Sequence, residues 1–442
     1  MAAGAKRSVS RVSSFRTASV LFAGVAIAAL VAGCAGGSAT KSPASGLATP
    51  RIGATSSPHS SPSIANVPTL APGSSTATVS PLASATPSSE PTAAGAFRLT
   101  GSMMTARYGQ TATRLADGRV LIVGGGLNVT DGDIQDAHVS AEFYDPASGT
   151  FKATGSMHTA RGDHTATLLS DGRVLIAGGS NDSGNVAQAE IYDPSTGKFS
   201  VTGTMRTARS GATAVLLHDG RVLIAGGFLG GTPPTSLTSA ELYDPATGEF
   251  SPAGSMSPGM DSTGTLLPDG RVLIAGGRDN SGSGIASAEL YDPATGKLSP
   301  TGSMSSGRMG ATATILPDGR VLIAGGSNDT SGYLAFLTSA ELYDPKTGTF
   351  AETGSMHIGC AGPVATALSD GRVLIVGGYD GTSFLTSAEL YDPKTGTFAE
   401  TGSMSIVQRQ ATAILLSDGR VLIAGGFDAQ QDALATAELF EP

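Results

Sequence analysis

The feature that most constrains the fold is a unit of about fifty residues that recurs seven times. Each copy contains a double glycine after an apolar run, and successive doublets lie 54, 48, 50, 49, 52 and 48 residues apart. The doublets begin at Gly124, Gly178, Gly226, Gly276, Gly325, Gly377 and Gly425. An Asp-Gly-Arg triplet precedes each doublet, and a methionine opens each unit. A period of this length indicates a propeller or a solenoid, in which each repeat packs against the next.

One unit divides into four predicted strands. "ATATIL" (311–316) and "VLIAGG" (321–326) flank Asp318-Gly319, a dipeptide that favours a hairpin with a type I′ turn. "SAELYDP" (339–345) ends at a proline, and "TFAETG" (349–354) supplies the fourth strand. No segment shows the periodicity of a helix, and 61 glycines suit a protein rich in turns. The sequence therefore predicts an all-β protein.

This four-stranded unit resembles the kelch repeat. The resemblance rests on the double glycine, on the aromatic residue of "LYDP", and on an apolar residue, mostly phenylalanine, six positions before each methionine. The aromatic residue of "LYDP" is Tyr144, Tyr192, Tyr243, Tyr291, Tyr343, Tyr391 or Phe440. The second position, six residues before the methionine, holds Phe97, Phe151, Phe199, Phe250, Leu298, Phe350 or Phe398. Kelch blades usually carry tryptophan at the second position, and this chain has none. The resemblance thus implies a propeller of a divergent kelch subtype.

The two ends of the array predict how the ring closes. The last unit stops at "AELFEP" and lacks a fourth strand, whereas an extra fourth strand, "GAFRLTGSM", precedes the first unit. Donation of residues 96–100 to the last unit completes every blade and leaves no open sheet edge. We therefore expect residues 96–442 to form a seven-bladed kelch-like β-propeller that is closed by its N-terminal strand.

The segment before the repeats predicts export and a lipid anchor. Four basic residues lie ahead of an apolar run at 17–30, which is too short for a comfortable membrane span. The run ends in "VAGC", which resembles a bacterial lipobox and implies a signal peptide at 1–33 with lipidation at Cys34. An ordinary cleavage site with an incidental cysteine is the alternative. Residues 34–95 are rich in Ser, Thr, Pro and Ala and predict a disordered tether.

Charge and cysteine content exclude some classes of function. Residues 1–95 contain six of the 27 basic and one of the 36 acidic side chains, so residues 96–442 have a net charge of −14. A domain with this charge repels the phosphate backbone, so we expect no nucleic-acid partner. Cys360 is the one other cysteine, and a lipidated Cys34 cannot pair with it, so no intrachain disulfide is expected.

Strand direction places two kinds of loop at opposite ends of the propeller. The Asp-Gly and Tyr-Asp-Pro turns share one end, and the variable loops after each double glycine share the other with the segments after each methionine. The variable loops are polar with aromatic tips, which suits contacts to a protein or a glycan, although simple turn chemistry is an alternative. The candidate contact residues are Phe228, Tyr333, Phe336, Tyr379, Phe384 and Phe427.

The segments after the methionines carry a second candidate set near the expected channel. Arg107, Arg161, Arg209 and Arg308 each lie four residues after a methionine. They are able either to hold an anion, such as a carboxylate-bearing sugar, or to bind carbonyl groups and bridge blades within the fold. Asp163, His164, Arg409 and Gln410 depart from the repeat pattern beside the channel. The Asp-Gly-Arg arginines and the glutamates of "AEL" predict pairing between strands or between blades.

Enzymatic readings find little support in the motifs. Copper radical oxidases of the galactose oxidase type share the propeller architecture, but Cys360 and the scattered histidines show no version of their copper ligands. "DGDIQD" at 131–136 lacks the full EF-hand pattern. We therefore assign no catalytic residue, metal or cofactor. The function expected is a membrane-anchored extracytoplasmic binding module for a protein or a glycan, and the alternative is a sugar-acting enzyme, mutarotase- or oxidase-like, with charged channel residues.

Overall fold

The computed structural model describes residues 95–130, 133–231, 234–257, 262–330 and 333–442. The predicted signal peptide, the lipidation site at Cys34 and most of the predicted tether lie outside these residues. The described residues form strands and turns without any helix. It follows that none of their segments is a helix long and apolar enough to cross a membrane.

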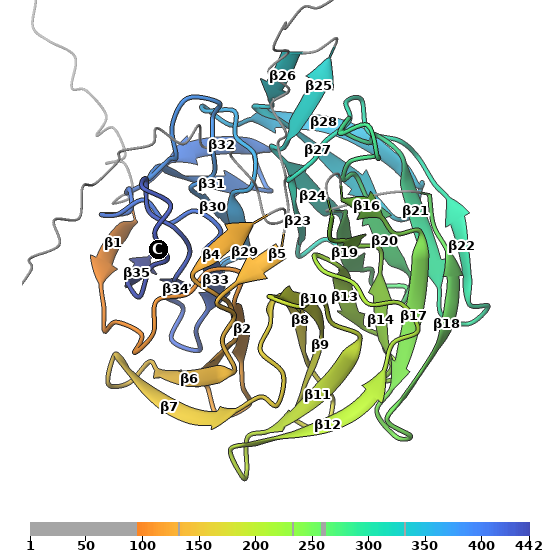
Figure 1. The fold of residues 1–442 in the computed structure, drawn as a ribbon. Helices are drawn as coiled ribbons and strands as arrows, with labels where there is room; N and C mark the ends of the chain where they lie inside the picture. Colours follow the sequence, from red (N-terminus) through yellow and green to blue (C-terminus); the bar gives the residue numbers. More distant parts are fainter. Residues whose placement is uncertain (1–94, 131–132, 232–233, 258–261, 331–332) are drawn as a thin grey trace, which may run out of the picture. The chain divides into compact units, whose positions relative to one another are not determined.

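Seven antiparallel blades surround a common axis, as the sequence predicted (Figure 1); each has four main strands, and in one of them the short β10 adds a fifth. We number the sheets as blades, each from the innermost to the outermost strand. Blades 1 to 3 are β2 (Thr111–Arg114), β3 (Val120–Val123), β6 (Ser140–Asp145) and β7 (Thr150–Ser156); β8 (Gly162–Leu168), β9 (Val174–Asn181), β11 (Gln188–Asp193) and β12 (Lys198–Thr204); β13 (Thr213–Leu216), β14 (Val222–Ala225), β17 (Ser239–Asp244) and β18 (Glu249–Ser255).

The remaining blades follow the same order. Blades 4 to 6 are β19 (Thr263–Leu266), β20 (Val272–Ala275), β21 (Ala288–Asp292) and β22 (Lys297–Pro300); β23 (Thr312–Ile315), β24 (Val321–Ala324), β27 (Ser339–Asp344) and β28 (Thr349–Ser355); β29 (Val364–Ala367), β30 (Val373–Val376), β31 (Ala388–Asp392) and β32 (Thr397–Glu400). Blade 7 is β33 (Thr412–Leu415), β34 (Val421–Ala424), β35 (Ala437–Glu441) and β1 (Ala96–Leu99).

The N-terminal strand closes the ring. β1 pairs with β35 in antiparallel register from Ala96↔Glu441 to Leu99↔Glu438. Phe97 faces Phe440 with ring centroids 5.0 Å apart, and the backbone N–H of Gly402 donates to the carbonyl of Gly95. Blade 7 thus takes strands from both ends of the described chain and has four strands like the other blades.

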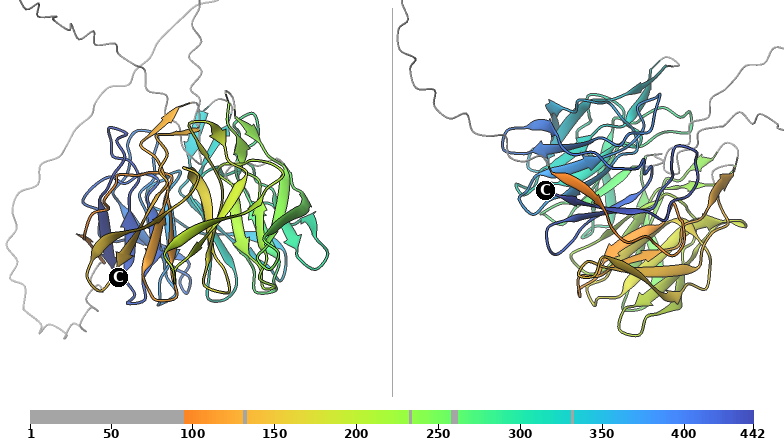
Figure 2. Two further views of the ribbon diagram at one scale, coloured as in Figure 1. Left: turned by 60° about the horizontal axis from the view of Figure 1, so that its bottom comes forward. Right: turned by 90° about the vertical axis from the view of Figure 1, so that its left-hand side faces the viewer.

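Short hairpins stand on the variable-loop end of the propeller, and Figure 2 shows them projecting from one end of the barrel-like ring. They are formed by β4 (Asn128–Thr130) with β5 (Asp133–Gln135), β15 (Phe228–Leu229) with β16 (Thr235–Ser236), β25 (Ser327–Thr330) with β26 (Tyr333–Phe336), and β10 (Gly184–Asn185) with the end of β9. These hairpins differ from blade to blade, so this end of the propeller varies in shape.

The Asp-Gly hairpins use a different turn from the predicted type I′. In blade 5 the amide of Gly319 donates to Leu316 and the amide of Leu316 donates to Arg320, which closes a three-residue loop. Gly319 has a φ of 86°, whereas Asp318 has no positive φ. Type I′ requires positive φ at both positions, so the prediction of that type is wrong. The Asp318 carboxylate instead accepts from the backbone N–H and the Nε of Arg320, which stabilises the wider loop.

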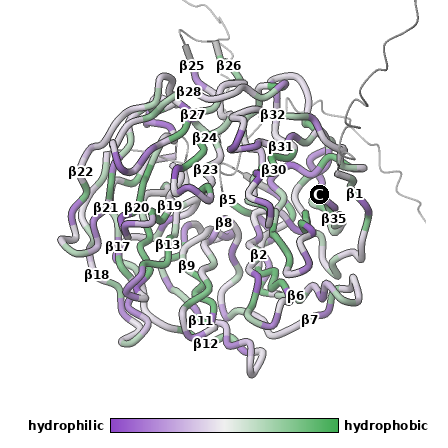
Figure 3. Tube along the Cα trace, turned by 180° about the vertical axis from the view of Figure 1, so that it is seen from behind, coloured by the Kyte–Doolittle hydropathy of each residue, from purple (hydrophilic) through white to green (hydrophobic). Residues whose placement is uncertain are grey.

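The hydrophobic core is divided among the seven junctions between blades. A buried cluster at each junction combines residues of two adjacent blades, for example Leu121 and Val123 of blade 1 with Val174 and Ile176 of blade 2. Figure 3 shows hydrophobic residues along middle strands such as β9 and β24, and hydrophilic residues mainly in outer strands and loops. Both faces of each sheet are covered, which explains the continuous apolar run before every double glycine.

The "LYDP" tyrosines link neighbouring blades. Each packs on the aromatic or aliphatic residue opposite it on the outer strand, and five of them share a hydrogen bond with a threonine of the preceding blade at 2.8–3.0 Å. For Tyr291 of blade 4 the corresponding position of blade 3 holds Ala253, and the hydroxyl of Tyr291 is buried without a hydrogen-bond partner. The bond is therefore missing at two of the seven junctions, because Tyr291 lacks its threonine partner and Phe440 has no hydroxyl.

Replacing Ala253 with threonine is expected to supply this bond. A net gain of about 0.5–1.5 kcal/mol in the free energy of unfolding is expected for a hydrogen bond to a buried, unpaired hydroxyl. Urea unfolding followed by tyrosine fluorescence measures the change. Ala253→Val is the matched control because it adds similar volume without a hydroxyl. Equal stability of the two variants would contradict the explanation.

Candidate functional site

The segments after the methionines line the inner part of the variable-loop end. In six blades the segment is fixed by backbone contacts to the residue that follows a double glycine, as between Tyr108 and Gly126, Met309 and Ser327, or Arg409 and Phe427. In the same six blades, the next residue of the segment after the methionine has a positive φ of about 50–66°. Consecutive segments also bond directly, since the amide of Asp163 donates to Gly109 at 2.7 Å. The loop end therefore has a rigid inner rim.

The four arginines of the second candidate set are part of the framework. Arg107, Arg161, Arg209 and Arg308 have no exposed surface. Each guanidinium forms an ion pair with the "AEL" glutamate of its own blade at 2.7–3.1 Å. It also donates to the first glycine carbonyl of the doublet and to the carbonyl two residues before the glutamate. Of the two roles left open by the sequence, these contacts fit the structural one.

The electrostatics of these pairs agree with a structural role. Burial lowers the pKa of Arg107, Arg161 and Arg209, and the paired glutamate opposes this effect in each case. A buried charge is tolerated only when it is paired and hydrogen-bonded, which every guanidinium here is. The carboxylates of these glutamates therefore pair with an arginine of their own blade and not with one of a neighbouring blade. No face of these arginines is left for a ligand anion.

The Asp-Gly-Arg arginines play a minor part. In the turn from Asp171 to Arg173, the Nη2 of the arginine lies 2.6 Å from the Oδ2 of the aspartate, and both side chains remain 40% or more exposed. An exposed pair of this kind contributes about 0–1 kcal/mol. Some of these arginines also reach the next blade, as Arg221 does with the carbonyl of Pro293.

Two departures from the repeat pattern occupy the inner rim. Asp163 and Gln410 have φ of 51° and 53°, at a place where Gly109, Gly211 and Gly310 have the same left-handed conformation. A residue with a side chain is strained there, and such strain is concentrated at functional sites. Both side chains are half-buried. The structure thus places polar groups at the rim of blades 2 and 7, which are not adjacent to one another because blade 1 lies between them.

His164 is unsuited to proton transfer with a ligand. Its side chain is buried, its Nε2 lies 2.9 Å from the hydroxyl of Thr111, and its Nδ1 has no hydrogen-bond partner. Burial lowers its pKa to about 3, and the nearby charges of Arg161 and Arg107 act in the same direction. The imidazole is therefore neutral near pH 7. Its contact with Thr111 connects the inner strands of blades 1 and 2.

An aromatic cluster extends across the loops of blades 5 to 7. Phe336 meets Tyr379 edge-on with ring centroids 5.5 Å apart, and Tyr379 lies 4.9 Å from Phe384. The Cζ of Arg409 lies 4.8 Å from the centroid of Phe384. A Cβ added to Gly381 would lie 2.7 Å from the ring of Phe336, so the loop approaches as closely as it does because that residue is glycine. We call Phe336, Tyr379, Phe384 and Arg409 the aromatic cluster.

The cluster is partly open to solvent. Its three aromatic side chains are half-buried, while Arg409 beneath them is 3% exposed. Burial lowers the pKa of Arg409 to about 10, against the opposing effects of Tyr379 and Tyr108, so the group remains a cation at neutral pH. A cation below aromatic faces is attracted by the ring electrons, and the attraction strengthens when water is excluded.

Phe228 and Phe427 do not lie at loop tips, where the sequence analysis placed them. Each directly follows a double glycine, pairs with the segment after a methionine, and is only 4–5% exposed. Phe427 stacks on Tyr108 with centroids 3.8 Å apart, and Ile134 completes this small core. Sequence reasoning missed Tyr108 and Ile134, whose only signal was their apolar character in polar loops. The side chain of Tyr333, in β26, lies outside the described residues.

The described residues do not assemble a metal site. No group of three or more His, Cys, Asp or Glu side chains among residues 95–442, apart from the gaps given above, is arranged to hold an ion. Cys360 is 3% exposed, and burial raises the pKa of its thiol to about 12, with Glu389 and Asp380 adding to the effect. The donor set of a copper oxidase is therefore not present in this part of the chain.

Fold and rim together define a seven-bladed β-propeller, and part of the chain matches the Kelch motif. The Kelch motif model matches residues 162–206, 209–257 and 361–405, which belong to the second, third and sixth repeats. No curated protein matches the chain.

Two solved structures share the fold. A "novel fungal alcohol oxidase with catalytic diversity among the AA5 family, in complex with copper" is similar with a TM-score of 0.63 and 18% identity, over 79% of this chain and 76% of the oxidase. The structure of YjhT is similar with a TM-score of 0.52 and 15% identity, over 68% of this chain and 99% of YjhT. At these identities the likeness concerns the fold alone.

Proposed function

We propose that this protein is a binding module that holds a protein or glycan ligand on the variable-loop end of its propeller. The observation that carries the proposal is the aromatic cluster, in which four side chains from three successive blades form one partly open surface. Tyrosine and arginine at such places contribute strongly to recognition, because they combine a large apolar area with a polar group.

The rigidity of the scaffold supports the same function. The inner rim is held by backbone bonds between blades and by four buried ion pairs, so the loops project from a framework that does not need to rearrange. A ligand that meets a preorganised surface loses less free energy to ordering. Loops that vary on an invariant scaffold are a common arrangement in binding proteins.

Removing the aromatic cluster is expected to weaken binding. A screen of the full protein against glycan and protein arrays first identifies a ligand. The double variant Tyr379→Ala/Phe384→Ala should bind this ligand at least about 10-fold more weakly, because each buried aromatic contact contributes about 1 kcal/mol or more. Leu229→Ala is the control, because Leu229 is exposed on the loop end of blade 3, outside the cluster. Unchanged affinity in the double variant would exclude this surface. Turnover of a bound sugar would favour the enzymatic alternative.

We propose further that the protein is exported and attached to a bacterial membrane through a lipid on Cys34. The support is the order of a basic region, an apolar run and "VAGC" in the sequence. A Cys34→Ser variant is expected to lose the anchor and to move from the membrane fraction to the soluble fraction. Cys360→Ser is the control, because that cysteine is buried in blade 6. A Cys34→Ser protein that stays in the membrane fraction would refute lipid anchoring.

A further inference from the structure

The two ends of the propeller differ in charge. At the turn end, which carries the Asp-Gly and Tyr-Asp-Pro turns, every Asp-Gly-Arg triplet contributes one acidic and one basic group. Four of the Tyr-Asp-Pro turns are also followed by a lysine, at Lys198, Lys297, Lys346 and Lys394. Basic groups therefore offset much of the acidic charge at this end.

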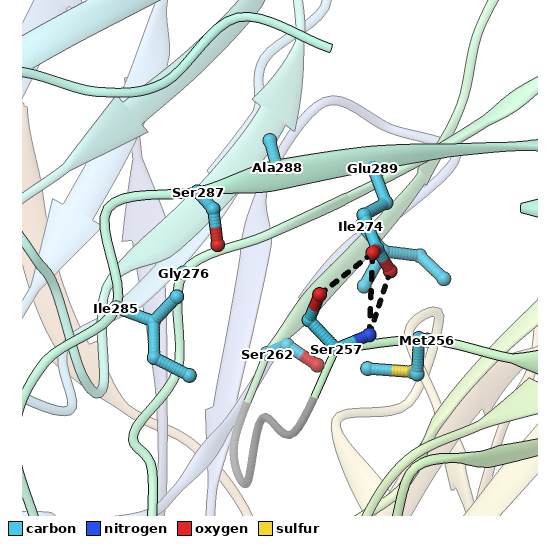
Figure 4. Close-up of a pocket in the computed structure, with 9 residues that line it drawn as sticks. All are labelled: Met256, Ser257, Ser262, Ile274, Gly276, Ile285, Ser287, Ala288 and Glu289. Carbon is cyan, nitrogen blue, oxygen red and sulfur yellow. Dashed lines mark hydrogen bonds between the residues drawn. The ribbon is translucent and has the colours of Figure 1, made fainter. Parts of the chain in front are cut away.

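Acidic groups dominate the loop end. The carboxylates near this end that are exposed or half-exposed among the described residues are Asp136, Asp163, Asp182, Asp279, Glu289, Asp380, Asp428 and Asp432. Arg206 is the one exposed arginine or lysine at the same end of the described chain. Figure 4 shows one of these carboxylates, Glu289, which accepts from the backbone N–H and the hydroxyl of Ser257 at 2.8–3.2 Å. The net charge of −14 on residues 96–442 therefore lies mainly at the loop end.

Three of these carboxylates border the aromatic cluster. They lie in the loops of blades 6 and 7, which the structure describes throughout, and are Asp380, Asp428 and Asp432. Arg409 lies against both loops, since its Cζ is 4.8 Å from the ring centroid of Phe384 in blade 6 and 5.9 Å from that of Phe427 in blade 7. Because Arg409 is only 3% exposed, the surface that a partner meets here is aromatic and acidic.

These carboxylates keep acceptor positions for a partner. Oδ1 of Asp380 accepts from the amides of Thr382 and Ser383, both at 2.7 Å, and Oδ1 of Asp428 accepts from two amides of its own loop at 2.8 and 2.9 Å. These bonds fix the two loops. Within the described chain, Oδ2 of Asp428 and the carboxylate of Asp432 accept no hydrogen bond. Burial alone would raise the pKa of Asp380, but hydrogen bonds from Ser383 and Thr382 lower it overall, so the group is ionised at neutral pH.

Both termini of the described chain lie at the turn end. Ala96 pairs with Glu441 at the start of β1. The carbonyl of Gly95 accepts from the amide of Gly402, as the glycine after a Tyr-Asp-Pro turn does in other blades. Figure 2 shows the C-terminus near the end opposite to the hairpins. Residues 1–94 are therefore attached at the turn end, and the loop end carries no terminus of the described chain.

We propose that the loop end of blades 6 and 7 binds a protein partner through a basic segment of that partner. A lysine or arginine side chain of the segment packs on the rings of the aromatic cluster, and the carboxylates of the two loops pair with basic groups of the partner. A cation is attracted both by aromatic faces and by carboxylates, and complementary charge speeds encounter. A neutral glycan gains little from this charge, so the surface favours a protein. The inference rests on the proposed function and names the class of partner for the same surface.

Selection of a phage library of short random peptides on the full protein tests the proposal. The selected peptides should be enriched in lysine and arginine. Asp428→Asn/Asp432→Asn, which keeps the Oδ1 acceptor of the blade 7 loop, should bind them at least about 5-fold more weakly at low salt, because two charged contacts are lost. The difference should shrink at high salt, which screens exposed charges. Glu352→Gln/Glu400→Gln is the matched control, because it removes the same charge from exposed positions on the outer strands of blades 5 and 6.

The outcomes separate this proposal from the binding function on which it rests. Absence of saturable peptide binding, selected peptides without an excess of basic residues, or equal binding by the wild-type protein and Asp428→Asn/Asp432→Asn would overturn it. An equal loss in the control variant would also overturn it, because net charge rather than the loops would then explain binding. A neutral glycan that is lost from Tyr379→Ala/Phe384→Ala but retained by Asp428→Asn/Asp432→Asn would support the proposed function and exclude a basic partner.

Discussion

A chain that starts at Gly101, without β1, is expected to lose at least about 4 kcal/mol of unfolding free energy. The truncation removes four registered residue pairs between β1 and β35 and the contact of Phe97 with Phe440. Strand hydrogen bonds contribute about 0.5–1.5 kcal/mol each, and loss of a packed phenylalanine adds to this. The urea midpoint of unfolding measures the effect. The matched control is a chain that starts at Ala93, which removes most of the preceding segment but keeps β1.

The same truncation is expected to change the association of the protein. Without β1, the edge of β35 presents unpaired backbone groups, which pair readily with other chains. Size-exclusion chromatography should therefore show oligomers or aggregates for the chain from Gly101 and none for the chain from Ala93. A synthetic peptide of residues 94–101 should restore part of the stability by adding to the open edge. Identical midpoints for the two chains would show that ring closure does not depend on β1.

Replacing Arg308 with alanine is expected to cost about 3–5 kcal/mol. The substitution leaves the carboxylate of Glu341, which is 2% exposed, without its ion-pair partner at 2.9 Å. It also removes the donors to Gly325 and to Ser339. Loss of one partner of a buried pair is strongly destabilising, because the remaining charge stays in a medium of low polarity.

A second arginine of the same blade provides the control for this experiment. Arg320 pairs with Asp318 at 2.7 Å while its side chain remains 34% exposed, so Arg320→Ala should cost only about 0–1 kcal/mol. Urea unfolding of both variants, with circular dichroism as the signal, measures the contrast. Equal losses of unfolding free energy for the two substitutions would show that the framework does not require the four buried arginines. Their role as ligand contacts would then need to be considered again.

The sequence predicted the number of blades and the way in which the ring closes. Both depend on local signals: a glycine doublet, an apolar run and a proline-terminated strand recur in every unit, and six of the seven blades form from residues close in sequence. The identical segments 337–356 and 385–404 illustrate this, since each supplies the two outer strands of a blade, β27 with β28 and β31 with β32. The turn type was wrong because the bonds between Leu316 and Arg320 widen the loop by one residue.

The candidate site could be predicted only in part. Phe336, Tyr379 and Phe384 were named from their character, but nothing in the sequence indicated that they contact one another across blades 5 and 6. The four buried arginines were recognised from the sequence as a set with two possible roles. Their partners were hidden because the "AEL" glutamate is present in all seven units, including those without an arginine, so the two residue types do not vary together.

What the sequence alone determined is the class of fold, since repeat length, turn residues and strand patterns act over short distances and specify each blade separately. Which side chains face solvent depends on the tertiary structure. Arg308 and Arg409 both follow a methionine closely, and both are buried, yet one pairs with a glutamate and the other lies beneath aromatic rings. The half-exposed Glu289 has the same sequence context as six buried glutamates. Burial depends on packing between residues of different strands and blades, which come together only when the ring has formed.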